Sequence, residues 1–118
     1  MPAHRVLILD DERLVRWSLS QRLRADGLEV SEASTAAEAV QAAPPDAAIL
    51  DYRLPDGDGI SVLKKLRAVD PDLPVIMLTA HNDTDLIVEA IKAGASDYIT
   101  KPVDVEQLVS LLRVWLYR

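Results

Sequence analysis

Five polar side chains each come directly after a short segment rich in apolar residues. They are Asp10, Asp11, Asp51, Thr79 and Lys101. Carboxylates bind hard cations and can act as nucleophiles in phosphoryl transfer, while an ammonium stabilises anionic oxygens. Adjacent carboxylates repel each other, and partial burial makes it harder to ionise both. The pair at 10–11 therefore needs a compensating cation, unless it is only the solvated start of a helix.

Charge arithmetic favours a metal. Ionised Asp10, Asp11 and Asp51 carry −3 together, and Lys101 contributes +1, which leaves −2 for a divalent cation to neutralise. The set contains neither histidine nor cysteine, and ligands that are all oxygen suit Mg²⁺ better than zinc. We therefore predict a magnesium site formed by the three carboxylates.

Each of these residues also has an ordinary structural explanation. Asp10 or Asp11 could cap a helix, and Asp51 could cap a turn. Thr79 is a common strand residue, and Lys101 could be a surface lysine. The conjunction favours chemistry, because the structural explanation needs a separate coincidence at four segment ends.

The spacing of apolar residues predicts strands that alternate with helices. The strands are expected at Val6–Leu9, Leu28–Ser31, Ala47–Leu50, Val75–Leu78 and Tyr98–Thr100, and the helices at Glu12–Ala25, Thr35–Ala42, Asp58–Ala68, Asp83–Ala93 and Asp104–Leu116. Such alternation with short connections is typical of a doubly wound parallel α/β sheet. In that architecture ligands bind beyond the carboxyl ends of the strands, so the five polar residues should converge there.

Composition narrows the class of protein. The chain has 118 residues, a net charge of −6, 49% hydrophobic residues and no cysteine. These values suit one domain over residues 1–118 and exclude disulfide and thiolate–metal chemistry. We expect no nucleic acid to bind this acidic domain, no membrane contact and a cytoplasmic location.

Several motifs resemble the receiver domain of two-component response regulators along nearly the whole chain. They are "LILDDE", "AAILDYRLPDGDG", "PVIMLTAH", "AIKAGASDYITKP" and "VDVEQLVSLL". The resemblance implies a flavodoxin-like fold with five helices and a five-stranded parallel sheet in the order 2-1-3-4-5. It also implies a Mg²⁺-dependent phospho-acceptor that is not an enzyme acting on a separate substrate.

The resemblance assigns roles at the predicted magnesium site. Asp51 matches the phospho-acceptor, Asp11 the direct magnesium ligand and Asp10 its water-mediated partner. Arg53 stands where the family supplies a backbone carbonyl to the metal.

The resemblance also implies a switch. Thr79 matches the hydroxyl that bonds a phosphoryl oxygen, Lys101 the lysine that pairs with the phosphoryl group, and Tyr98 the aromatic residue that reorients. The Lys101-Pro102 bond matches one that is often cis in the family.

Partners follow from the same resemblance. A sensor histidine kinase or a phosphotransfer protein would donate the phosphoryl group and dock on the first helix. Trp17 on that helix either contacts a partner or stacks on Arg13. "VRW" also resembles receivers of enhancer-binding transcription activators. Apolar residues beside the core stripe of the last helix suggest a homodimer, or simply a wide buried stripe: Val109, Leu111 and Leu116.

Two rival functions fit parts of the sequence. A magnesium-dependent phosphohydrolase of this fold usually has a D-x-D pattern after the first strand, which "LDDER" lacks. A pseudo-receiver would bind partners without phosphorylation, but the complete polar set argues against it. "LPDGDG" could hold a second metal, although Asp58 fits a helix cap better. His81 is expected to be an exposed loop residue.

Overall fold

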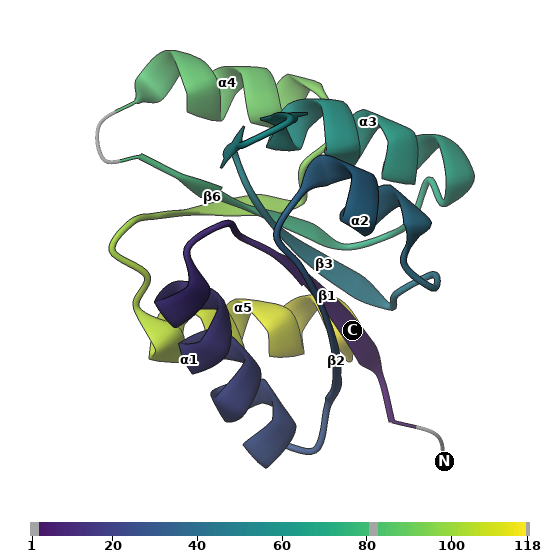
Figure 1. The fold of residues 1–118 in the computed structure, drawn as a ribbon, viewed down its shortest axis with the longest axis vertical. Helices are drawn as coiled ribbons and strands as arrows, with labels where there is room; N and C mark the ends of the chain where they lie inside the picture. Colours follow the sequence, from purple (N-terminus) through teal and green to yellow (C-terminus); the bar gives the residue numbers. More distant parts are fainter. Residues whose placement is uncertain (1–2, 81–82, 118) are drawn as a thin grey trace.

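The computed structural model describes residues 3–80 and 83–117 (Figure 1). The predicted loop position of His81 lies outside the described residues. The elements in chain order are β1 (Arg5–Leu9), α1 (Arg13–Ala25), β2 (Glu29–Ala33), α2 (Ala36–Gln41), β3 (Ala47–Asp51), β4 (Arg53–Leu54), β5 (Gly57–Asp58), α3 (Gly59–Val69), β6 (Val75–Thr79), α4 (Thr84–Lys92), β7 (Asp97–Thr100) and α5 (Val105–Leu116).

The five longer strands form one parallel sheet in the order β2-β1-β3-β6-β7. This is the predicted doubly wound topology, with strand order 2-1-3-4-5 when only these strands are counted, and the fold prediction is confirmed. β4 and β5 form a short two-stranded antiparallel hairpin.

The sheet separates two hydrophobic layers. Side chains of successive strand residues point to opposite faces, so Leu7 and Leu9 pack on one side while Val6 and Ile8 pack on the other. The first layer is covered by α2, α3 and α4, and the second by α1 and α5 (Figure 1). Burial on both faces explains why β1, β3 and β6 read as continuous apolar runs.

Capping residues set where the helices begin. The side chains of Thr35, Asp58, Asp83 and Asp104 each accept a backbone N–H from the first turn of the helix that follows. Asp56 accepts from the backbone N–H groups of Ala36 and Ala37. Both aspartates of "LPDGDG" therefore serve helix starts, which confirms Asp58 as a cap.

One sequence expectation needs correction, and for the last helix the structure favours one of the two alternatives. β2 runs over Glu29–Ala33 rather than Leu28–Ser31, because an edge strand is only partly buried and gives a weaker apolar signal. On α5, Val109 is buried and Leu111 and Leu116 pack against the core. A wide buried stripe therefore accounts for those three residues.

Across the described residues, no helix has the length and apolar character needed to cross a membrane.

Candidate functional site

The carboxyl ends of β1 and β3 bring three carboxylates together. Asp10, Asp11 and Asp51 each offer an oxygen, and these atoms lie within 4.8 Å of one another. Asp10 is fully buried, Asp51 is 6% exposed, and Asp11 is exposed. Within the described ranges this is the only cluster of acidic or histidine side chains arranged in this way. The predicted convergence of the three carboxylates is therefore present in the fold.

The two oxygens of Asp10 face different groups. Oδ1 accepts the backbone N–H of Glu12 at 2.8 Å, which forms an Asx-turn just before α1. Oδ2 is buried, has no hydrogen bond from any described residue, and lies 3.1 Å from Nζ of Lys101. Asp10 thus stabilises the turn before α1 with one oxygen and presents the other to the carboxylate cluster.

Gly59 packs directly against the backbone of Asp51. A Cβ atom at position 59 would lie 2.2 Å from the backbone oxygen of Asp51, so only glycine permits this approach. The backbone N–H of Gly59 also donates to the carbonyl of Tyr52 at 2.7 Å. The start of α3 therefore packs directly on the strand end that carries Asp51. Sequence analysis did not single out Gly59, although a glycine directly after a capping aspartate was the available signal.

Lys101 reaches three carboxylates from the end of β7. Its ammonium lies 3.1 Å from Asp10 Oδ2, 3.1 Å from Asp51 Oδ2 and 2.8 Å from Glu12 Oε1. The interaction with Glu12 was not predicted, since a glutamate at a helix start usually serves the helix alone. The ammonium therefore offers compensating positive charge to both buried aspartates.

Burial and charge shift the protonation of this cluster. Burial, and then the negative charge of Asp10, raise the pKa of Asp51 to about 6, although Lys101 acts in the opposite direction. Partial burial pulls the pKa of Lys101 down, but its hydrogen bonds to Glu12 and Asp51 outweigh this and raise it above its ordinary value. Asp51 is therefore mostly ionised at neutral pH, at a cost that a cation would relieve.

An open cleft of about 460 Å³ gives solvent access to Asp51. Arg53 lines it and is exposed, while Lys101 closes one side. The cleft is lined by Asp11, Glu12, Asp51, Tyr52, Arg53, Ala80, Leu86 and Lys101. A small anion can therefore reach the Asp51 carboxylate from outside.

Two predicted residues lie outside the lining of this cleft. Thr79 is 1% exposed, and its buried hydroxyl has no hydrogen-bond partner among residues 3–80 and 83–117. Its backbone carbonyl accepts the N–H of Lys101 at 2.8 Å, so it adjoins the site. Tyr98 is 38% exposed on β7, opposite Met77 in the strand pairing. The Lys101-Pro102 bond is cis.

The donor set fits a hard divalent cation. Three carboxylate oxygens lie close together, and one of them is buried with no hydrogen bond to the residues that the structure describes. Such an arrangement is unfavourable unless positive charge is supplied. Asp10, Asp11 and Asp51 could hold such an ion, and Lys101 already supplies one positive charge.

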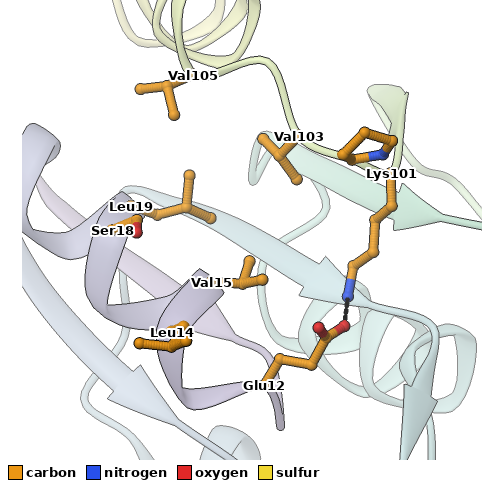
Figure 2. Close-up of a pocket in the computed structure, with 9 residues that line it drawn as sticks. Glu12, Leu14, Val15, Ser18, Leu19, Lys101, Val103 and Val105 are labelled. Carbon is orange, nitrogen blue, oxygen red and sulfur yellow. Dashed lines mark hydrogen bonds and ion pairs between the residues drawn. The ribbon is translucent and has the colours of Figure 1, made fainter.

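A second hollow of about 600 Å³ lies between α1 and the segment that joins β7 to α5. We call it the α1 groove, and its lining is mostly apolar: Glu12, Leu14, Val15, Ser18, Leu19, Lys101, Pro102, Val103 and Val105 (Figure 2). Leu14 is 79% exposed there. Trp17, also on α1, is 58% exposed, and no stacking on Arg13 is found in the part of the chain described.

Fold and site together define a doubly wound α/β domain with an acidic cleft at its strand ends. Residues 6–113 match the family described as "Response regulator receiver domain". This match covers most of the chain, and the chain belongs to that family as the receiver domain of a two-component response regulator.

Relatives and solved structures agree with this assignment. The chain is 43% identical over 117 residues to the transcriptional regulatory protein PrrA of Mycobacterium tuberculosis, covering 97% of this chain and 50% of that protein. It is 38% identical over 110 residues to the DNA-binding transcriptional regulator NtrC of Escherichia coli, covering 91% of this chain and 24% of that protein. A CheY-like receiver domain protein from Methanospirillum hungatei superposes with a TM-score of 0.91 at 32% identity, covering 98% of this chain and 94% of that one. The chain thus spans half or less of the length of these two regulators.

The raised pKa of Asp51 predicts a pH-dependent stability difference. In EDTA at pH 7, Asp51→Asn should be more stable than the parent by on the order of 1 kcal/mol, because the amide removes a buried charge. An unfolded aspartate titrates near about 4. As pH falls from about 6 to about 4, folded Asp51 takes up its proton first, so the parent gains stability and the difference shrinks. Urea denaturation of both proteins from pH 4 to 7 measures this difference in the free energy of unfolding.

Asp72→Asn makes the same change at an exposed loop position and should show no such pH dependence. A parent clearly more stable than Asp51→Asn at pH 7 would contradict the electrostatic description of the site.

Proposed function

We propose that residues 1–118 form a receiver that accepts a phosphoryl group on Asp51 from a phosphohistidine of a sensor kinase or phosphotransfer protein. The observation that carries this proposal is the convergence of Asp10, Asp11 and Lys101 on Asp51 at one open cleft. In the transfer, a carboxylate oxygen of Asp51 forms the new bond to phosphorus while the bond from phosphorus to the donor imidazole nitrogen breaks.

The surrounding residues provide positioning and charge. Phosphoryl transfer has a loose transition state, so catalysis depends mainly on alignment and on stabilising the equatorial oxygens. Lys101 holds an ammonium 3.1 Å from Asp51 Oδ2, where it can follow the phosphoryl oxygens. No general base is needed, because Asp51 is mostly ionised at neutral pH.

Mg²⁺ is the proposed cofactor, with Asp11 and Asp51 as direct ligands, Asp10 acting through water and the backbone carbonyl of Arg53 completing the protein ligands. When bound, Mg²⁺ supplies charge neutralisation for the carboxylates and the phosphoryl oxygens. The supporting observation is the buried Oδ2 of Asp10, which lies beside two further carboxylates and, among the described residues, has an ion pair with Lys101 but no hydrogen bond.

The α1 groove is the proposed docking surface for the phosphoryl donor. Glu12 and Lys101 line both this groove and the Asp51 cleft, so a protein seated in the groove can present a phosphohistidine to Asp51. Exposed Leu14 in the groove and exposed Trp17 on the same helix offer apolar contact area.

Other parts of the proposal concern the wider protein. Besides the phosphoryl donor, we propose for this chain a homodimer through α4, β7 and α5 and a cytoplasmic location. We also propose that this domain contacts neither a membrane nor nucleic acid. The likeness of "VRW" to receivers of enhancer-binding activators is a further proposal. The exposed apolar side chains of Val88, Ile91 and Val114 support the dimer surface. The match to the receiver family argues against the phosphohydrolase, and a pseudo-receiver that binds partners without phosphorylation is the competing function.

The phospho-acceptor is tested by labelling. With acetyl phosphate and Mg²⁺, the parent should gain one phosphoryl group by intact mass, and Asp51→Asn should gain none. Asp72→Asn, the matched change at an exposed site, should label like the parent. Full labelling of Asp51→Asn would place the nucleophile elsewhere. Repeating the parent in EDTA tests the metal requirement, and undiminished labelling there would contradict it.

The switch is tested at Thr79. Its buried hydroxyl has no partner in the described part of the chain, and a phosphoryl oxygen at the neighbouring strand end would provide one. Movement of Thr79 would open space for Tyr98 to turn inward, changing the surface of β7 and α4. A coupling of about 1–3 kcal/mol suffices for such a switch.

Thr79→Ala should therefore still bind beryllofluoride at Asp51 but lose most of the chemical-shift change at Tyr98 and in α4. Thr79→Ser keeps the hydroxyl and should respond like the parent. Equal responses at Tyr98 and α4 in the parent and Thr79→Ala would rule out this relay.

A further inference from the structure

One ion pair separates the Asp51 cleft from the α1 groove. Glu12 and Lys101 are the two residues that line both hollows, and Lys101 Nζ donates to Glu12 Oε1 at 2.8 Å. Figure 2 shows the pair at the edge of the groove, with Val15 and Val103 nearby. A change in this pair therefore alters a wall of both hollows at once.

The ion pairs of Lys101 with its three acidic partners differ in how much free energy it costs to break them. The Glu12 side chain is 59% exposed, whereas those of Asp10 and Asp51 are 0% and 9% exposed. Water can solvate a freed Glu12 carboxylate, but it cannot reach Asp10 in the same way. Glu12 is thus the partner whose release costs least.

We infer that Glu12 is a positioning residue that holds Lys101 until an anion occupies Asp51, and that its release then changes the α1 groove. This inference rests on the proposed phosphorylation of Asp51. An anion there adds acceptor oxygens that compete for the three N–H donors of Lys101, and its negative charge repels Glu12. The displaced carboxylate then lies free at the rim of a mostly apolar groove.

The α1 groove should bind the donor protein more tightly before phosphoryl transfer than after it. Before transfer, Glu12 is neutralised by Lys101, and the groove offers apolar side chains such as Leu14 and Val105. After transfer, an unpaired carboxylate at the rim must be desolvated by any apolar partner that stays bound. Phosphorylation of Asp51 therefore weakens the binding of the donor protein in the α1 groove and favours its release.

Beryllofluoride with Mg²⁺, a phosphoryl mimic, tests the competition for Lys101. In Glu12→Gln the anion no longer competes with a carboxylate. An exposed ion pair contributes at most about 1 kcal/mol, so half-saturation should need about three- to fivefold less beryllofluoride than in the parent. Glu89→Gln changes net charge equally at an exposed site on α4 and should match the parent. Equal or weaker binding in Glu12→Gln would overturn the inference.

Glu12→Asp separates contact from charge. It keeps the negative charge but shortens the side chain, so it should bind beryllofluoride more tightly than the parent if the contact with Lys101 matters. Binding like the parent would mean that only the charge acts, which overturns the positioning role.

Methyl NMR provides a readout in the groove itself. Adding beryllofluoride should shift the methyl signals of Val15, Val103 and Val105 in the parent, and should shift them by less than half as much in Glu12→Gln. Equal shifts in both proteins would overturn the inference and leave the proposed function intact. Failure of the parent to bind beryllofluoride would overturn the proposed function together with this inference.

Discussion

The buried charges of Asp10 and Asp51 are the constraint on which the rest of this domain depends. Two carboxylates that are 0% and 6% exposed cannot both ionise cheaply beside each other. The ammonium of Lys101, 3.1 Å from each, offsets part of this cost, and the pKa of Asp51 still rises to about 6. Part of the negative charge at the site therefore stays uncompensated. For this reason a bound cation or a change at Asp51 can have large effects.

The fold makes this arrangement possible. Parallel strands end at one edge of the sheet, so residues 10, 51, 79 and 101 meet although they are far apart in the chain. Hydrophobic layers on both faces of the sheet hold these ends, and Gly59 lets α3 pack directly against the backbone of Asp51. Elsewhere, capping side chains such as Asp58 and Asp104 supply the helix starts.

The sequence predicted the buried parts of the fold better than the edges. The central strands are apolar on both faces, and their ends were predicted to within one residue. β2 was placed one to two residues too early, because an edge strand lacks that signal. The convergence of Asp10, Asp11, Asp51 and Lys101 followed from strand ends alone. The contact between Glu12 and Lys101 did not, since it depends on how two side chains from distant elements meet.

The central claim is that Lys101 and the three carboxylates form one site around Asp51. A crystal structure of the domain with Mg²⁺ and beryllofluoride tests it most directly. We expect beryllium bonded to a carboxylate oxygen of Asp51, magnesium bound by Asp11 and Asp51, and the Lys101 ammonium within hydrogen-bond distance of a fluoride. Beryllofluoride bound away from Asp51, or a Lys101 side chain turned away from the bound anion, would contradict the account.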